Sequence, residues 1–178
     1  MKKPILVATL GYPGSGKTYF SERLSKEFNF FHISSDKIRS EMFENPTYKP
    51  EEHRAVFNVI FWLTLELLKK GTSVIVDANA NKPINRNKLL KLATKAKTGF
   101  IIVHIKTPVE VAEKRILKRR NLKNLERKKY YKHIEISVLH SEKAEIEYPT
   151  KREKVLEIDG LKSYKEQVKV FKKWFNSR

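Results

Sequence analysis

A short glycine-rich segment carries the residues in this chain that are best suited to chemistry. Residues 11–18 read Gly-Tyr-Pro-Gly-Ser-Gly-Lys-Thr and match the pattern G-x-x-x-x-G-K-[ST]. Glycines let successive backbone N–H groups turn toward one anion, and the lysine and the hydroxyl can bind a terminal phosphate and Mg²⁺. We therefore expect ATP and Mg²⁺ to bind here. The residues assigned to the nucleotide are Gly11, Pro13, Gly14, Ser15, Gly16, Lys17 and Thr18.

Two further side chains follow the apolar segment that comes after this loop. Asp36 and Arg39 are three residues apart, so on a helix they share a face. Asp36 could accept a hydrogen bond from a substrate hydroxyl and orient it toward the γ-phosphorus, and Arg39 could bind an anionic group of the same substrate. The alternative is a helix cap beside a solvated arginine. Because ligands bind beyond the carboxyl ends of parallel strands, we favour the substrate interpretation.

A third set of polar residues follows the apolar run at 74–76. Asp77 could hold the metal, directly or through water, or it could simply begin a loop. Asn79 and Asn81 could orient Asp77 or contact substrate, and turn chemistry explains them equally well. His104 lies between apolar neighbours, and we interpret it as a core or edge histidine rather than a catalytic one.

Residues 110–132 contain ten Lys or Arg and three Glu. Arg115 and Arg119 are four residues apart and share a helical face. Such arginines could close over a nucleotide and neutralise charge on the transferring phosphoryl group. Two alternatives stay open: a solvated basic helix, or a nucleic-acid-binding ridge in which Tyr130 and Tyr131 stack on bases.

The elements that must position these residues can be read from hydrophobic periodicity. Apolar runs alternate with helical patterns along the chain, which predicts a three-layer α/β P-loop NTPase fold, with a five-stranded parallel sheet and helices on both faces. The candidate strands are Ile5–Leu10, Phe30–Ile33, Ser73–Val76, Phe100–Lys106 and Lys154–Ile158. The candidate helices are Lys17–Phe28, Asp36–Phe43, Glu51–Lys70, Ile84–Lys97, Val109–Arg120, Leu125–Lys143 and Tyr164–Phe175.

Composition limits the class of protein further. The chain has 178 residues, which suits one domain covering residues 1–178. Lys and Arg number 38 against 20 Asp and Glu, a net charge of +18 that indicates either a polyanionic partner or a solvated Lys-rich surface. There is no cysteine, which excludes disulfides and cysteine-based zinc sites, and no apolar run reaches 18 residues. We expect no membrane association and a cytoplasmic location.

The layout resembles the small P-loop kinases of the polynucleotide kinase and zeta-toxin-like group over nearly the whole chain. In that group one strand ends in Asp-x-x-Arg, here Asp36 to Arg39. Another strand runs into Asp-x-Asn-x-Asn, here residues 77–81, with an arginine soon after, here Arg86. Residues 155–160 are similar to the last strand of the group and to the loop that borders the adenine.

The resemblance implies a role for each matched side chain. Asp36 is then the general base for a 5′-hydroxyl, and Arg39 is the clamp on the adjacent substrate phosphate. Arg119 corresponds to the arginine of a lid, at about residues 115–132, that covers the γ-phosphate, with Arg115 in support. The catalytic residues are thus Lys17, Asp36, Arg115 and Arg119, with Arg119 also on the nucleotide. The substrate-binding residues are Asp36, Arg39, Asn79 and Arg86, and the metal ligands are Thr18 and Asp77.

These observations predict an enzyme that moves the γ-phosphate of ATP to a hydroxyl acceptor. A polynucleotide or nucleotide 5′-hydroxyl is the favoured acceptor, because of the Asp36 and Arg39 pair and the charge of +18. A kinase of small metabolites or sugars is the alternative. An NTP-driven switch without an acceptor is less favoured, because the Asn-Lys-x-Asp element of GTPases is absent. The oligomeric state stays open.

Overall fold

The computed structural model describes residues 3–78, 80–120 and 135–177. Five strands form one sheet in which every neighbouring pair is parallel. The strands are β1 (Ile5–Leu10), β2 (Phe31–Ser34), β3 (Val74–Asp77), β4 (Gly99–Lys106) and β5 (Val155–Asp159). Their order across the sheet is β2-β3-β1-β4-β5. The predicted five-stranded parallel sheet is confirmed.

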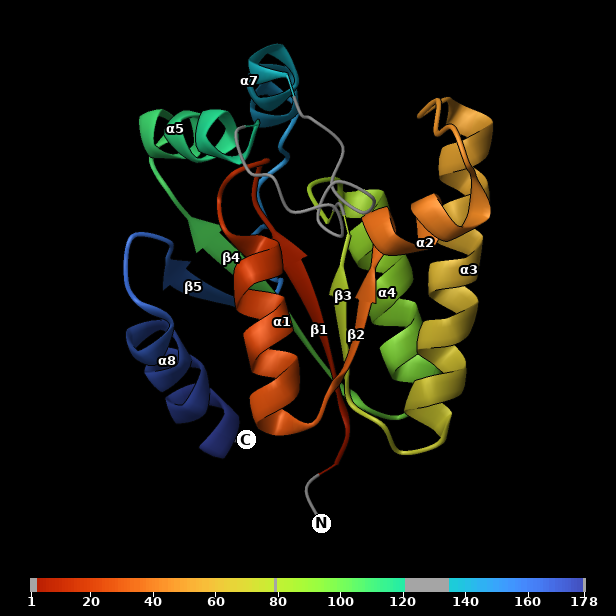
Figure 1. Cartoon of the computed structure of the whole chain (residues 1–178). Helices are drawn as coiled ribbons and strands as arrows, with labels where there is room; N and C mark the ends of the chain where they lie inside the picture. Colours follow the sequence, from red (N-terminus) through yellow and green to blue (C-terminus); the bar gives the residue numbers. More distant parts are fainter. Residues whose placement is uncertain (1–2, 79, 121–134, 178) are drawn as a thin grey trace.

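Helices cover both faces of this sheet (Figure 1). The described helices are α1 (Lys17–Phe28), α2 (Ser35–Met42), α3 (Pro50–Lys69), α4 (Pro83–Lys95), α5 (Val109–Arg120), α7 (Ile136–Ala144) and α8 (Tyr164–Asn176). α1 and α8 lie on one face, and α3 and α4 lie on the other. All six residues of β1 are buried, as expected for a central strand covered on both sides.

The apolar core therefore divides into two clusters, one on each side of the sheet. Successive residues of a strand point to opposite faces, so Leu6 and Ala8 pack toward α3 and α4 while Ile5 and Val7 pack toward α1 and α8. In the second cluster Phe171 is fully buried and meets aromatic rings of both α1 and α8. Together the two clusters hold the strands in register.

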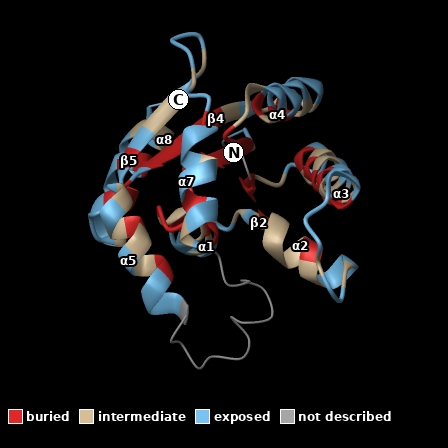
Figure 2. Cartoon of the chain, turned by 90° about the horizontal axis from the view of Figure 1, so that it is seen from above, coloured by how far each residue is buried: buried red, intermediate tan, exposed pale blue. Residues whose placement is uncertain are grey.

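A smaller third cluster lies beyond the carboxyl ends of the strands, where α5 and α7 pack together. Its buried members are Tyr12, Ala112, Ile116, Leu139 and Ile146. The view from above shows α7 crossing the sheet near the start of α1 (Figure 2). This cluster anchors α5 and α7 to the glycine-rich loop that leaves β1.

Observed and predicted boundaries differ mainly where polar residues extend a strand. The predicted second and third strands ended at Ile33 and Val76, but the structure continues them to Ser34 and Asp77, which pair with each other across the sheet. The expectation stopped at the last apolar residue, whereas backbone pairing does not depend on apolar side chains. Only the end of the helix predicted over 125–143 lies among the described residues, as α7.

No described helix is long and apolar enough to cross a bilayer.

Candidate nucleotide-binding and phosphoryl-transfer site

The glycine-rich loop connects β1 to α1 and is built on backbone angles that only glycine adopts easily. Gly11, Gly14 and Gly16 have φ angles of 141°, 79° and 108°. A Cβ atom on Gly14 would lie 2.6 Å from the carbonyl oxygen of Ala112 in α5. The loop therefore curls tightly against α5 and presents the N-terminus of α1, where unpaired N–H groups and the helix dipole favour an anion.

The outer side of the loop is held by side chains that follow β4. The Thr107 hydroxyl donates to the carbonyl oxygen of Ser15 over 2.7 Å, and the Tyr12 hydroxyl donates to the carbonyl oxygen of Thr107. Arg115 of α5 donates to the Ser15 carbonyl oxygen over 3.2 Å and to the Gly160 carbonyl oxygen over 2.7 Å. These bonds fix the position of the loop relative to β4, α5 and Gly160.

The side chain of Lys17 folds back over its own loop. Its Nζ donates to the carbonyl oxygens of Gly11, at 2.6 Å, and Tyr12, at 3.1 Å. Burial lowers the pKa of Lys17, and the negative charges of Asp77 and Glu142 partly oppose this shift. The Lys17 ammonium, bonded to two carbonyl oxygens, can exchange them for phosphate oxygens when a nucleotide enters.

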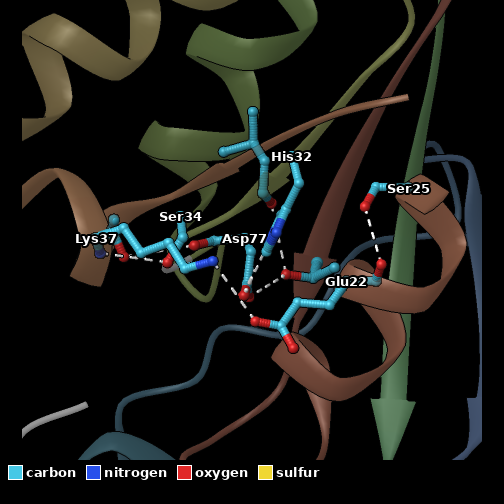
Figure 3. A network of polar contacts seen from close by, with 9 residues as sticks. Glu22, Ser25, His32, Ser34, Lys37 and Asp77 are labelled. Atoms are coloured by element: carbon cyan, nitrogen blue, oxygen red, sulfur yellow. Dashed lines mark hydrogen bonds and ion pairs between the residues drawn. The ribbon is translucent and has the colours of Figure 1, made fainter. Parts of the chain in front are cut away.

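Asp77, the carboxylate that the sequence assigns to the metal, ends β3 in a buried position. It is 5% exposed, and one of its oxygens lies 3.3 Å from Thr9 Oγ1. The other lies 3.4 Å from Nε2 of His32 (Figure 3). Burial raises the pKa of Asp77, but hydrogen bonds from His32 and Thr18 and the charge of Lys17 outweigh burial, so the pKa of Asp77 lies below its ordinary value. Asp77 is therefore ionised at neutral pH.

The predicted metal ligands lie near each other, since the Thr18 hydroxyl contributes to the lowered pKa of Asp77. A hydroxyl and a carboxylate are the hard oxygen ligands that suit Mg²⁺. Within the part of the chain that the structure describes, no group of three His, Cys, Asp or Glu could hold a metal by itself. The residues fit a Mg²⁺ ion that completes its coordination with nucleotide phosphates and water, as this ion usually does.

Asp36 is the second residue of α2, a helix that Ser34 caps by accepting from the Lys37 N–H. Burial, together with the like charge of Asp77, raises the pKa of Asp36 from 3.8 to about 6. Lys17 and Arg39 act in the opposite direction. The two alternatives for this segment, a helix cap and a site carboxylate, therefore apply to different residues. Ser34 is the cap, and Asp36 is a carboxylate whose charge interacts with Lys17 and Asp77.

Arg39 does not point to an open substrate site. Its side chain is 4% exposed, donates to Glu52 of α3, lies 3.5 Å from His53 Nδ1 and stacks on the ring of Tyr48. The expected clamp on a substrate phosphate is not supported by this placement, because the guanidinium is used within the protein.

Arg86 is likewise enclosed. It is 1% exposed, and its Nη1 donates to the carbonyl oxygens of Ala80, Asn81 and Glu147. Its Nε and Nη2 donate to the carboxylate of Glu153 at 2.6 Å and 3.3 Å. This geometry ties α4 to the segment before β5 and does not support the expected substrate contact.

The lid arginines are placed differently from each other. Arg115 braces the loop from outside, so the structure gives it a positioning contact rather than a contact with transferring phosphate. Arg119 is exposed at the end of α5, and its positive charge reaches Asp36 and Lys17. The predicted Asn79, most of the lid region, and Tyr130 and Tyr131 lie outside the described residues.

Asn81, expected to orient Asp77 or contact substrate, accepts the Gly11 N–H over 3.2 Å and thereby fixes the start of the loop. Other contributors were missed by sequence reasoning. Thr9 and His32 hold Asp77, and each is a polar residue within an otherwise apolar strand, which was the available signal. Thr107 gave only a weak signal, as the first residue after β4. His104 is 9% exposed beside the ring of Tyr148, in keeping with a core or edge histidine.

Curated relatives of this chain are kinases. It is 29% identical to adenylate kinase 1 of Schistosoma mansoni over 134 residues, which cover 70% of this chain and 68% of that protein. It is 26% identical to the L-seryl-tRNA(Sec) kinase of Methanococcus maripaludis over 117 residues, covering 65% of this chain and 46% of that protein.

Solved structures share the fold. A sugar kinase from Janibacter sp. HTCC2649 superimposes with a TM-score of 0.72 at 18% identity, covering 98% of this chain and 95% of that one. Kti12 from Chaetomium thermophilum, in complex with ADP-AlF3, gives 0.71 at 19% identity and covers 97% and 98%. The Pnkp1/Rnl/Hen1 RNA repair complex gives 0.60 at 24% identity and covers 83% and 48%.

The family assignment rests on a match along most of the chain. Residues 6–135, from β1 through the glycine-rich loop and beyond α5, match the AAA_33 family, described as an AAA domain. With the kinase relatives, this match supports a nucleotide-binding P-loop phosphotransferase. The chain belongs to the AAA_33 family.

Proposed function

We propose that residues 1–178 form one kinase domain that transfers the γ-phosphate of ATP to a hydroxyl acceptor held by Asp36. The observation that carries the proposal is that Asp36, Asp77 and Lys17, at the carboxyl ends of the strands, act on one another electrostatically. A nucleotide switch needs the lysine and the metal site, but it has no use for a second carboxylate with a raised pKa.

The proposed reaction is an in-line displacement. The acceptor oxygen forms a bond to the γ-phosphorus, the bond between that phosphorus and the ADP oxygen breaks, and the hydroxyl proton passes to Asp36 and then to water. Lys17 binds the β- and γ-phosphate oxygens, while Thr18 and Asp77 would hold Mg²⁺. When bound, this ion neutralises charge on the phosphates. Asp36 contributes chiefly by orienting the hydroxyl, because phosphoryl transfer depends mainly on positioning.

The favoured acceptor from the sequence was a polynucleotide 5′-hydroxyl. The charge of +18 and the Asp-x-x-Arg pattern support it, and the RNA repair complex with a similar fold is compatible with it. A phosphate clamp at Arg39 would, however, require that side chain to leave Glu52.

A small hydroxylated metabolite is the second candidate acceptor, and the enclosed Arg39 favours it. A metabolite without a phosphate near its reacting hydroxyl needs no cation at that position. In either case we propose that Arg119 covers the γ-phosphate as part of a lid at about residues 115–132 and that Arg115 supports it through the loop. We further propose a cytoplasmic enzyme, since its reaction consumes ATP.

The proposal is tested by transfer of ³²P from [γ-³²P]ATP to DNA and RNA oligonucleotides, tRNA, nucleosides, sugars and polyols, with ADP release measured in parallel. We expect ADP release that depends on one acceptor class, with the label recovered on that acceptor. Lys17→Ala should abolish transfer and weaken ATP binding while leaving the circular dichroism spectrum unchanged. ATP hydrolysis at one rate with and without every acceptor, and no labelled product, would support the switch instead.

A further inference from the structure

A carboxylate that no part of the sequence argument used lies on α7, the helix above the glycine-rich loop (Figure 2). Within α7, Ile136, Leu139 and Glu142 are the residues that are not exposed, and they recur every three positions. Leu139 is fully buried in the cluster that contains Tyr12 of the loop. Glu142 therefore extends from the inward face of α7 toward the site.

The electrostatic surroundings of Glu142 include two residues of the site, Lys17 and Asp36. Its negative charge acts on Lys17, and its own pKa is raised by burial and by the like charge of Asp36, against the opposing charge of Lys17. Asp36 belongs to α2 and Glu142 belongs to α7, so the charge of Lys17 interacts with carboxylates from two different helices.

We propose that Glu142 is a specificity-determining residue for the acceptor: it selects hydroxyl compounds that carry a second hydrogen-bond donor, an ammonium or a hydroxyl, beside the reacting hydroxyl, and it disfavours a phosphate at that position. This inference rests on the proposed kinase function. It assigns Glu142 a role in binding and not in proton transfer, which belongs to Asp36.

Two physical arguments carry the assignment. An ionised carboxylate only accepts hydrogen bonds, so it binds hydroxyl and ammonium groups and repels phosphate. The cation expected to attract a phosphate on the acceptor side, Arg39, is already bonded to Glu52. Glu142 thus adds a negative charge near Asp36, while Nη1 of Arg39 donates to Glu52 instead of facing the acceptor.

The test uses two matched sets of acceptors that differ only in the group beside the reacting hydroxyl. One set is 2-amino-1,3-propanediol, glycerol and glycerol 2-phosphate. The other is 3′-amino-3′-deoxythymidine, thymidine and thymidine 3′-phosphate, so that polyol and nucleoside acceptors are both covered. The proteins are wild type, Glu142→Gln, and Glu145→Gln as a matched control, since Glu145 is an exposed carboxylate just past the end of α7.

We expect wild-type kcat/KM to fall from the ammonium to the hydroxyl to the phosphate member of the set that is phosphorylated. Glu142→Gln should reduce the ratio of ammonium to phosphate by about tenfold, and Glu145→Gln should leave it within about twofold. Unfolding midpoints of all three proteins check that the fold is kept. A wild-type preference for the phosphate member, or a ratio unchanged by Glu142→Gln, would overturn the proposal.

A second readout separates this inference from the kinase proposal. Acceptor dissociation constants are measured by calorimetry in the presence of Mg²⁺ and a non-hydrolysable ATP analogue, where no transfer occurs. Wild-type affinities that fall from the ammonium to the hydroxyl to the phosphate member, with this order lost in Glu142→Gln, would support the assignment of Glu142. If no acceptor is phosphorylated but this order is found, only the kinase proposal fails. Equal affinities for all members in both proteins would refute the assignment.

Discussion

The side chain of Arg39 donates a hydrogen bond to the carboxylate of Glu52, and both side chains are buried where α2 packs against α3. Glu52 also accepts the backbone N–H of Thr47 at 2.6 Å and of Tyr48 at 3.2 Å. The pair therefore joins α2, α3 and the segment between them. Because Asp36 lies one turn before Arg39, the same pair fixes the position of the proposed base.

Breaking this pair should destabilise the protein. Arg39→Ala leaves the Glu52 carboxylate buried without its cation, and we expect the unfolding midpoint to fall by roughly 6–20 °C. Arg54→Ala, which removes an exposed arginine paired with Glu51 on the same helix, should change it little. Thermal unfolding followed by circular dichroism measures both. A stable Arg39→Ala that loses only affinity for phosphate-bearing acceptors would restore the clamp interpretation.

Arg115 should affect nucleotide binding more than the chemical step. Its bonds to the carbonyl oxygens of Ser15 and Gly160 brace the loop, so Arg115→Ala should weaken ATP binding about tenfold, or about 1.4 kcal/mol. Lys118→Ala, at an exposed position of the same helix, should bind ATP normally. Fluorescent nucleotide titration gives the affinities, and single-turnover kinetics gives the rate. A large loss of rate at saturating ATP without loss of affinity would identify Arg115 as a lid residue over the phosphate.

Gly160 should not tolerate a side chain. A Cβ atom there would lie 2.9 Å from the carbonyl oxygens of Lys106 and Ser15 and would overlap the Thr107 hydroxyl. We expect Gly160→Ala to weaken ATP binding by at least about tenfold, since the loop would have to shift away. Gly71→Ala is the control for the effect of a Gly-to-Ala change away from the loop, because a Cβ atom at Gly71 meets nothing within 4 Å. Its φ of 80° adds backbone strain but no steric clash. Normal ATP affinity in Gly160→Ala would contradict the close packing of this segment on the loop.

The raised pKa of Asp36 has opposite consequences for stability and for activity. The folded protein holds the Asp36 proton up to about pH 6, against 3.8 for the free carboxyl, so the ionised form destabilises the fold as pH rises through that interval. Asp36→Asn, which cannot ionise, should gain about 1–3 kcal/mol at pH 7.5 and much less at pH 4. Urea unfolding at both pH values measures the gain. The same gain at both pH values would mean that burial of charge is not its cause.

The acidic limb of the pH profile should report the same group. Asp36 accepts the acceptor proton only when ionised, so kcat/KM for the acceptor should fall below about pH 6. Variants that retain Asp36 but alter Glu145 should keep this limb. A flat profile between pH 5 and 7 would exclude Asp36 as the titrating base.

Local sequence patterns were sufficient to predict the strands, the helices and the glycine-rich loop, because the residues that define each of them are close together in the sequence. The apolar run of β1, the glycines at 11, 14 and 16, and the helical spacing of Phe20 and Leu24 lie close together in the sequence. Chain order and the rules of parallel sheets then placed Asp36 and Asp77 at the same edge, and the structure brings them within electrostatic reach.

The contact partners of the arginines could not be predicted from local sequence patterns. Arg86 pairs with Glu153, 67 positions away, and Arg115 reaches Gly160, 45 positions away. A spacing pattern can show that an arginine shares a face with a neighbour, but it cannot show which distant carboxylate or carbonyl packs against that face. The same limit explains why Glu142, on a helix far along the chain from Lys17, was not anticipated.

The most direct test of the account is a rapid-quench measurement of phosphoryl transfer by wild type and Asp36→Asn, at saturating ATP, Mg²⁺ and the acceptor found in the screen. The ATP dissociation constant of each protein is measured in parallel. We predict transfer at least about 100-fold slower in Asp36→Asn, with ATP affinity within about twofold of wild type. Equal transfer rates, or a loss confined to ATP affinity, would contradict the assignment of Asp36 to the acceptor hydroxyl.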